Sequence, residues 1–102
     1  MPPKEKNSQA FILFADIAGY TAIMQKYEAS AAQLLQKFRT SLQELVPLHQ
    51  GEVINFYGDG ALCIFDNPIK MTKAAMRLQE RYRAEPIVPV RIGLHSLSLI
   101  HI

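Results

Sequence analysis

Two aspartates in short glycine-containing segments are the residues of this sequence best suited to chemistry. Asp16 opens the segment DIAGYT at residues 16–21, and Asp59 is the centre of the segment GDG at residues 58–60. Two carboxylates held close together repel each other unless a cation lies between them. Magnesium suits such a pair, because it prefers hard oxygen ligands and usually takes one or two carboxylates together with substrate phosphates. Taken singly, each aspartate is better explained as a helix cap or a turn former.

The backbone that follows Asp16 offers a second part of a binding site. Gly19 allows a sharp turn, and the amides around Tyr20 and Thr21 open a predicted helix. The first amides of a helix have no partner within it, and the helix dipole favours an anion there. A carboxylate-bound metal beside a helix start that holds phosphate is the outline of a nucleoside triphosphate site.

A small number of strands and helices must position these segments. Residues 10–15 form a short, continuously apolar run, which predicts a strand buried on both faces. From about Thr21 to Val46 the apolar residues recur at three- and four-residue steps. This spacing predicts one long amphipathic helix that ends before Pro47.

Two further strands are predicted on either side of the second aspartate. They cover residues 51–57 and 61–65, and the glycine-flanked turn joins them as a hairpin. Strict alternation along the first of them places its apolar side chains on opposite faces in two pairs, Val53 with Tyr57 and Ile54 with Phe56.

A second helix and a final strand complete the predicted fold. The helix opens at residues 67–68 with Asp66 or Asn67 as its cap, and Pro86 follows its end. Its predicted inner stripe consists of Met71, Ala75, Leu78 and Tyr82. Residues 87–95 form the last strand. The order predicts an α+β, ferredoxin-like βαββαβ sandwich, in which the first strand lies beside the hairpin and the two aspartates can meet.

Length, composition and charge exclude several classes of protein. At 102 residues the chain has room for one domain, and its net charge of +2, with acidic and basic residues interspersed, gives no basic surface for nucleic acid. No apolar stretch approaches the roughly 20 residues that span a bilayer, so no membrane segment is predicted. The single cysteine, Cys63, lies in an apolar run and is predicted to be a buried, inert thiol. We expect a soluble cytoplasmic protein, with residues 1–9 as a flexible leader.

Three segments, taken in order, resemble the consecutive signatures of the class III adenylate/guanylate cyclase family. They are FADIAGYT at 14–21, GDG at 58–60 and VRIGLHS at 90–96. The resemblance covers residues 10–96 and implies part of a cyclase catalytic domain. It implies an enzyme of intracellular signalling that attacks the α-phosphorus of ATP, or of GTP, with the ribose 3′-oxygen. The products are a 3′,5′-cyclic nucleotide and pyrophosphate.

The same resemblance implies the metal site and the assembly. Asp16 and Asp59 would be the catalytic carboxylates and would bind two Mg²⁺ ions, helped by the backbone carbonyl of Ile17. Mn²⁺ could substitute for Mg²⁺. Active sites of the family form between two catalytic domains, which implies a homodimer.

Substrate contacts also follow from the resemblance, with one departure from the family pattern. The amides of Gly19, Tyr20 and Thr21 would hold the triphosphate, and Arg91 would contact the terminal phosphates, a surface ion pair being the alternative for that arginine. Family members active on adenine commonly carry a lysine four residues before the second aspartate. Asn55 stands there and offers a donor and an acceptor without charge. ATP is favoured, but base selectivity stays open.

The C-terminal residues are the second departure. The family motif continues after Ser96 with a glycine and further elements, whereas residues 97–102 read LSLIHI. We interpret this tail as non-native and the domain as C-terminally truncated, so that the fragment alone is expected to be inactive. The alternative is a genuine last strand that extends to the terminus.

Two other functions compete with a working cyclase. The first is a catalytically inactive, cyclase-like module for nucleotide sensing or dimerisation, which Asn55 leaves open. The second is a diguanylate cyclase of related topology. That class should carry a Gly-Gly-Asp/Glu-Glu-Phe hairpin, and the residues from Gly58 onward read GDGAL instead.

Overall fold

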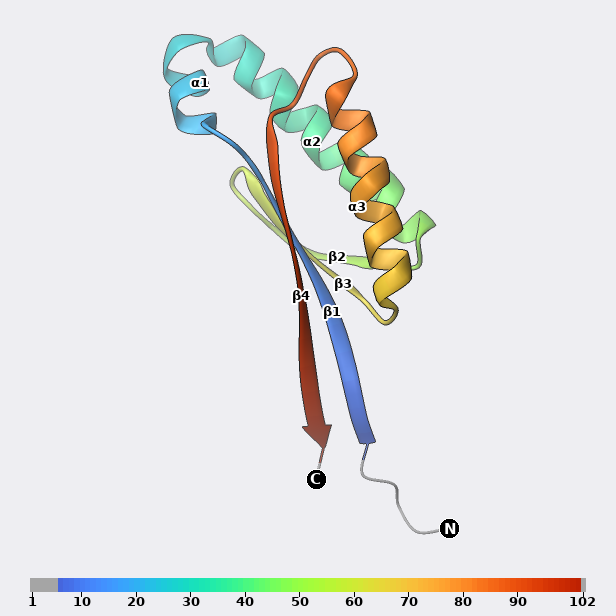
Figure 1. Cartoon of the computed structure of the whole chain (residues 1–102). Coiled ribbons are helices and arrows are strands. Elements are labelled where there is room, and N and C mark those ends of the chain that lie inside the picture. The colour runs from blue at the N-terminus through green and yellow to red at the C-terminus, as the bar shows by residue number, and fades with distance from the viewer. Residues whose placement is uncertain (1–5, 102) are drawn as a thin grey trace.

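The chain forms a four-stranded antiparallel sheet whose two long helices pack on one face (Figure 1). The computed structural model describes the backbone of residues 6–101 and the side chains of residues 9–98. In order, the elements are β1 (Lys6–Ile17), α1 (Tyr20–Lys26), α2 (Glu28–Leu48), β2 (Glu52–Tyr57), β3 (Gly60–Phe65), α3 (Pro68–Arg83) and β4 (Val90–His101). The sheet order β2-β3-β1-β4 is the ferredoxin-like βαββαβ arrangement, which confirms the predicted fold class.

The hydrophobic core lies between the sheet and the helices α2 and α3. Strand β1 contributes Leu13, Ala15 and Ile17, all buried, and β3 contributes Ala61, Cys63 and Phe65. The predicted inner stripe of α3 is confirmed: Met71, Ala75, Leu78 and Tyr82 are buried, together with Ala74. Burial raises the pKa of the Cys63 thiol to about 12, in keeping with the predicted inert cysteine.

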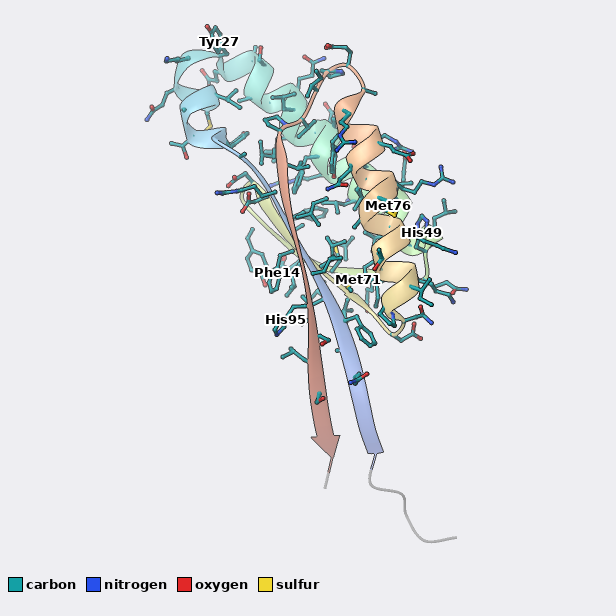
Figure 2. The ribbon with its side chains drawn as sticks, viewed as in Figure 1. Phe14, Tyr27, His49, Met71, Met76 and His95 are labelled. Carbon is teal, nitrogen blue, oxygen red and sulfur yellow. The ribbon has the colours of Figure 1, made fainter. Side chains whose placement is uncertain are left out.

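The opposite face of the sheet is not covered by the helices. Side chains alternate along a strand, so Ile12, Phe14 and Asp16 of β1 lie on this open face. Phe14 is 50% exposed, and Figure 2 shows it with His95 on the side away from α2 and α3. The prediction that this strand is buried on both faces was therefore wrong for the described residues, because nothing among them covers the second face.

The single long helix predicted from Thr21 to Val46 is instead two helices. Tyr27 separates them with a backbone outside the helical region, at φ −140° and ψ 69°. No side chain of α1 is fully buried, although Tyr20 at its first position packs against the core while partly exposed. Helix α2 also continues through Pro47 to Leu48. A proline in the last turn is tolerated there at the loss of its own backbone hydrogen bond.

A β-bulge in β2 overturns the predicted alternation of that strand. Val53 pairs with Cys63 and Asn55 pairs with Leu62, so Ile54 is one extra residue without a partner on β3. The extra residue shifts the pattern by one position. Val53 and Phe56 therefore both pack against the core, whereas Ile54 and Tyr57 are exposed.

Both ends of the described chain belong to the sheet. Strand β1 begins at Lys6, so residues 6–9 of the expected leader pair with β4, and residues 1–5 lie outside the described range. Strand β4 begins at Val90 rather than at residue 87, because Pro86 and Pro89 cannot donate to a ladder. It then continues through residues 97–101, opposite residues 6–10.

Candidate active site

Asp16 lies near the C-terminal end of β1, on the open face of the sheet. Its neighbours across the sheet are Gly60 on β3 and Arg91 on β4. Directly opposite residues of an antiparallel pair share a face. The side chain of Asp16 is 43% exposed, so its carboxylate is accessible while its backbone is held on both sides.

Asp59 lies at the tip of the hairpin between β2 and β3, and this tip is attached to the end of β1. The Ile17 amide donates a hydrogen bond of 3.0 Å to the Asp59 carbonyl. Gly60 lies so close to β1 that a Cβ built on it would be 3.8 Å from the Cβ of Asp16. The two aspartates therefore come together from distant parts of the sequence, as the topology predicted.

Gly58 gives the hairpin tip its shape. Its φ of +58° is in the left-handed region, which glycine adopts without the steric cost that other residues pay. This turn directs the chain back toward β1 just before Asp59.

Arg91 forms an ion pair with Asp16 in the structure. Its Nε donates to the Asp16 Oδ1 at 2.8 Å, and the arginine side chain is 72% exposed. The hydrogen bond and the charge of Asp16 raise the pKa of Arg91, and the charge of Asp59 adds to this. Arg91 therefore lies within electrostatic reach of both carboxylates.

The turn after Asp16 leads directly into α1. Gly19 adopts φ 67° and ψ 23°, in the left-handed region, and no side chain caps the helix. The first hydrogen bond of the helix runs from the Ile23 amide to the Gly19 carbonyl, at 3.1 Å. The amides of Tyr20 and Thr21 precede that bond, so they have no helical acceptor. They open a helix of seven residues, not the long helix that was expected.

The donor set fits magnesium. No group of three or more His, Cys, Asp and Glu side chains gathers anywhere in the described part of the chain. Asp16, Asp59 and the backbone carbonyl of Ile17 offer oxygen donors, which together would supply the partial shell that Mg²⁺ takes from a protein before substrate phosphates complete it. Mn²⁺ accepts the same oxygen ligands.

Asn55 lies on the same open face, away from the two aspartates. Pairing across the sheet forms rows of residues, and every second row faces the open side. One open-side row contains Asn55, Leu62, Phe14 and Gly93. The next open-side row contains Tyr57, Gly60, Asp16 and Arg91. Asn55 is thus two strands from Asp16, on the edge strand β2, and it is exposed.

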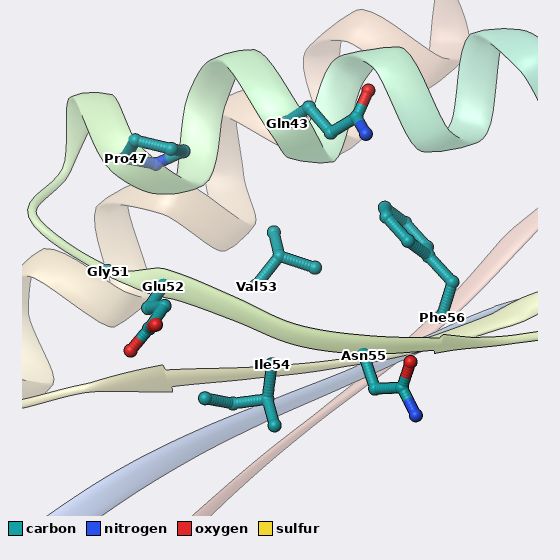
Figure 3. A pocket seen from close by; sticks show the side chains of 8 residues that line it. All are labelled: Gln43, Pro47, Gly51, Glu52, Val53, Ile54, Asn55 and Phe56. Carbon is teal, nitrogen blue, oxygen red and sulfur yellow. The ribbon is translucent and has the colours of Figure 1, made fainter.

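One groove of the described structure lies away from the aspartates. It lies between α2 and β2, has a volume of about 530 Å³, and is lined by Gln43, Pro47, Gly51, Glu52, Val53, Ile54, Asn55 and Phe56. Figure 3 shows Val53 and Phe56 pointing toward α2, and Asn55 pointing away from it. Asn55 is the only predicted site residue that lines this groove, so the groove and the aspartate site are separate features.

Arg39 is a residue near the site that the sequence did not single out. It lies on α2, and its Nη2 donates to the Gly58 carbonyl at 2.8 Å. A single arginine on a helix face carries no sequence signal for such a contact, because the contact depends on how the helix crosses the hairpin.

Comparisons with known proteins identify relatives of this chain. The model of a family described as the adenylate and guanylate cyclase catalytic domain matches residues 3–100. "Putative adenylate cyclase 3" of Rhizobium meliloti (strain 1021) is 37% identical over 76 residues, which are 74% of this chain and 13% of the relative. "Adenylate cyclase" of Glutamicibacter nicotianae is 26% identical over 81 residues, 78% of this chain and 20% of that protein.

A solved structure shares the fold. The guanylate cyclase domain of RhGC from Catenaria anguillulae, in complex with GTP, superposes with a TM-score of 0.76 at 18% identity. The match covers 92% of this chain and 58% of that one. The chain therefore spans only part of each of these three proteins. No helix among residues 6–101 has both the length and the apolar character needed to cross a bilayer.

Proposed function

Because this chain belongs to the adenylate and guanylate cyclase catalytic domain family, we propose that it forms the metal- and triphosphate-binding part of a class III cyclase active site. The observation that carries the proposal is the attachment of the Asp59 hairpin to the end of β1. The Ile17–Asp59 hydrogen bond holds the backbone of Asp59 against the end of β1, and Gly60, the next residue, pairs with Asp16. The proposed enzyme converts ATP, or alternatively GTP, to the 3′,5′-cyclic nucleotide and pyrophosphate.

Each residue has a role that suits its position. Asp16 and Asp59 would hold two Mg²⁺ ions with the Ile17 carbonyl, and the amides of Gly19, Tyr20 and Thr21 would hold the triphosphate. When bound, the ions lower the pKa of the ribose 3′-hydroxyl and stabilise the charge of the in-line transition state. The remaining contribution of the chain is to orient the triphosphate, so that the 3′-oxygen faces the α-phosphorus and pyrophosphate is the leaving group.

Arg91 would change partner when substrate binds. It pairs with Asp16 across β1 and β4 in the structure and is largely exposed. If Asp16 holds a metal ion, its carboxylate would be less available to accept the hydrogen bond from Arg91. Arg91 is then free to contact the terminal phosphates, for which its planar fork is well suited.

The base and the partner are proposed from the open face of the sheet. Asn55 and Phe14 lie in the row next to the aspartates, where Asn55 could donate to and accept from a purine edge. Two relatives bear adenylate cyclase names, which favours ATP. The exposed apolar side chains on this face favour a second catalytic domain as the partner, in a homodimer.

A Mn²⁺ titration followed by electron paramagnetic resonance tests the metal site in the 102-residue chain. We expect Asp16→Ala and Asp59→Ala each to weaken Mn²⁺ binding by on the order of tenfold or more, since each removes a direct ligand. Asp66→Ala, at an exposed aspartate after β3, is the control and should bind as the unsubstituted chain does. Equal affinity in all four chains would remove the basis of the proposal. We also expect the 102-residue chain alone to form no cyclic nucleotide above a no-enzyme control.

The second candidate function is a cyclase-like module that senses nucleotide or dimerises without turnover. Asn55 favours it, because a neutral side chain stands where an adenine-reading lysine was expected. ATP titrations with and without Mg²⁺ separate the two functions. A cyclase site should bind ATP much more tightly with the metal, whereas a degenerate module should show little difference.

A further inference from the structure

Arg39 connects helix α2 to the hairpin that carries Asp59. Its Nη2 donates to the Gly58 carbonyl at 2.8 Å, and its guanidinium carbon lies 5.5 Å from the centre of the Phe56 ring. Phe56 precedes the turn on β2 and packs against the core. One side chain therefore contacts both the strand that leads into the turn and the turn itself.

The contact buries one nitrogen of Arg39, which costs free energy that an arginine exposed to water would not lose. The Nε of Arg39 is buried and has no hydrogen-bond partner within the described residues. A buried unpaired donor is destabilising, whereas an arginine pointing into water would keep all its donors solvated. The contact with the Phe56 ring and the hydrogen bond to Gly58 offset that cost, and both are made to residues of the hairpin.

The position of the contact relates it to the metal site. Gly58 has a left-handed backbone and directly precedes Asp59. The Asp59 carbonyl is held from β1 by the Ile17 amide, and the Gly58 carbonyl is held from α2 by Arg39. Two successive peptide groups of the tip are thus fixed by two different elements. If only one of these two hydrogen bonds were present, the tip could rotate about it.

We propose that Arg39 is a positioning residue, which holds the hairpin tip so that the Asp59 carboxylate faces Asp16. The proposal rests on the proposed function, in which Asp59 is a metal ligand. Arg39 does not touch the metal or the substrate; it acts through the backbone of Gly58. Removing partners that orient a metal ligand typically weakens metal binding by about 10- to 100-fold.

The experiment compares substitutions of Arg39 with a matched control on the same helix. Arg39→Met keeps the apolar stem and removes the hydrogen bond and the charge, and Arg39→Lys keeps the charge and a donor. Lys37→Met is the control, because Lys37 also joins α2 to backbone carbonyls, those of Ala84 at 2.5 Å and Pro86 at 2.9 Å, which lie outside the hairpin. Like Arg39→Met, the Lys37→Met variant removes one positive charge and hydrogen bonds from α2 to backbone carbonyls.

Two readouts are taken on the 102-residue chain: the Mn²⁺ dissociation constant and the hydrogen exchange of the amides of residues 57–60. We expect Arg39→Met to weaken Mn²⁺ binding by on the order of tenfold and to speed exchange at the tip. Arg39→Lys should restore part of both, and Lys37→Met should change neither. A merely structural arginine would give Arg39→Met and Lys37→Met the same profile.

The outcomes separate this inference from the proposed function. Wild-type Mn²⁺ affinity and tip exchange in Arg39→Met would overturn the inference and leave the metal site standing. If Asp59→Ala binds Mn²⁺ as well as the unsubstituted chain does, the proposed function fails, and the positioning role fails with it. If Arg39→Met does not fold, Arg39→Lys decides: unchanged Mn²⁺ affinity and unchanged tip exchange in that variant would overturn the inference.

Discussion

At the scale of the residue, one carboxylate has two competing cationic partners. Asp16 accepts a hydrogen bond from Arg91 in the structure, and in the proposed function the same carboxylate would hold a metal ion. Exposed ion pairs contribute little, since water and salt screen them. The arginine therefore neutralises Asp16 without holding it strongly, and a divalent ion can replace it.

Replacing Arg91 should affect metal and nucleotide in opposite directions. In Arg91→Gln, Mn²⁺ binding without nucleotide should strengthen by about two- to fivefold, because the competing cation is gone. Mg²⁺–ATP binding should weaken, because the phosphates lose a contact. Paramagnetic resonance measures the first effect and isothermal titration calorimetry the second. Arg81→Gln, which breaks the ion pair with Glu44, is the control and should alter neither. Weaker Mn²⁺ binding in Arg91→Gln would show that the arginine does not compete.

The buried thiol gives a pH dependence of stability. Burial raises the pKa of Cys63 from 9.0 to about 12, so between these values the unfolded chain releases a proton that the folded chain keeps. The contribution of Cys63 to the free energy of unfolding is therefore complete below pH 9 and falls as the pH rises.

Urea unfolding of the native chain and of Cys63→Ala at pH 8 and pH 10 measures this effect. The native chain should lose about 1 kcal/mol more than the variant between the two pH values. Tyr82, whose pKa burial also raises, is present in both chains and largely cancels in the comparison. An identical pH dependence in the two chains would mean that the Cys63 thiol has the same pKa in the folded and the unfolded state.

At the scale of the element, the sequence pattern predicted those strands, helices and caps that depend on interactions between residues close in the sequence. The apolar run of residues 10–15, the stripe of α3 and the cap at Asn67 all follow from side-chain spacing and backbone chemistry, and all are present. The break at Tyr27 and the bulge at Ile54 do not follow in this way. Each depends on which neighbours an element meets, and no spacing within ten residues encodes that.

The cap of α3 is a direct test of such a local force. The Asn67 Oδ1 accepts from the Ile69 amide at 2.9 Å and from the Lys70 amide at 3.0 Å. Asn67→Ala should lower the free energy of unfolding by about 1 kcal/mol, because two amides at the helix start lose their acceptor. Urea denaturation provides the measurement. Gln79→Ala, at an exposed position of the same helix, should change stability much less; a loss as large as that of Asn67→Ala would argue against the cap.

At the scale of the whole molecule, the two faces of the sheet differ. Helices α2 and α3 cover one face, and the other exposes Phe14 (50%) near the candidate site and Leu97 (41%) farther along β4. The contact of the Asp59 hairpin with the end of β1 was predictable, because topology alone brings a first strand beside the hairpin. The contact of Arg39 was not predictable, because it depends on the packing of a helix over that hairpin.

The open face should mediate self-association. We expect the 102-residue chain to associate with increasing concentration in sedimentation velocity, and Phe14→Ser to shift the association to at least several-fold higher concentration. Met76→Ser is the matched control, since Met76 is 58% exposed on the outer side of α3 (Figure 2). Equal association of the two variants would place the contact elsewhere.

The bulge at Ile54 also bears on how chain length can vary among related sequences. Because Ile54 has no partner on β3, its loss would join Val53 directly to Asn55 and leave every cross-strand pair in place. The spacing from Asn55 to Asp59 lies wholly on the hairpin side of the bulge and would be preserved. A relative that lacks this residue should therefore align with a one-residue gap at position 54 and keep the same side chains facing the site.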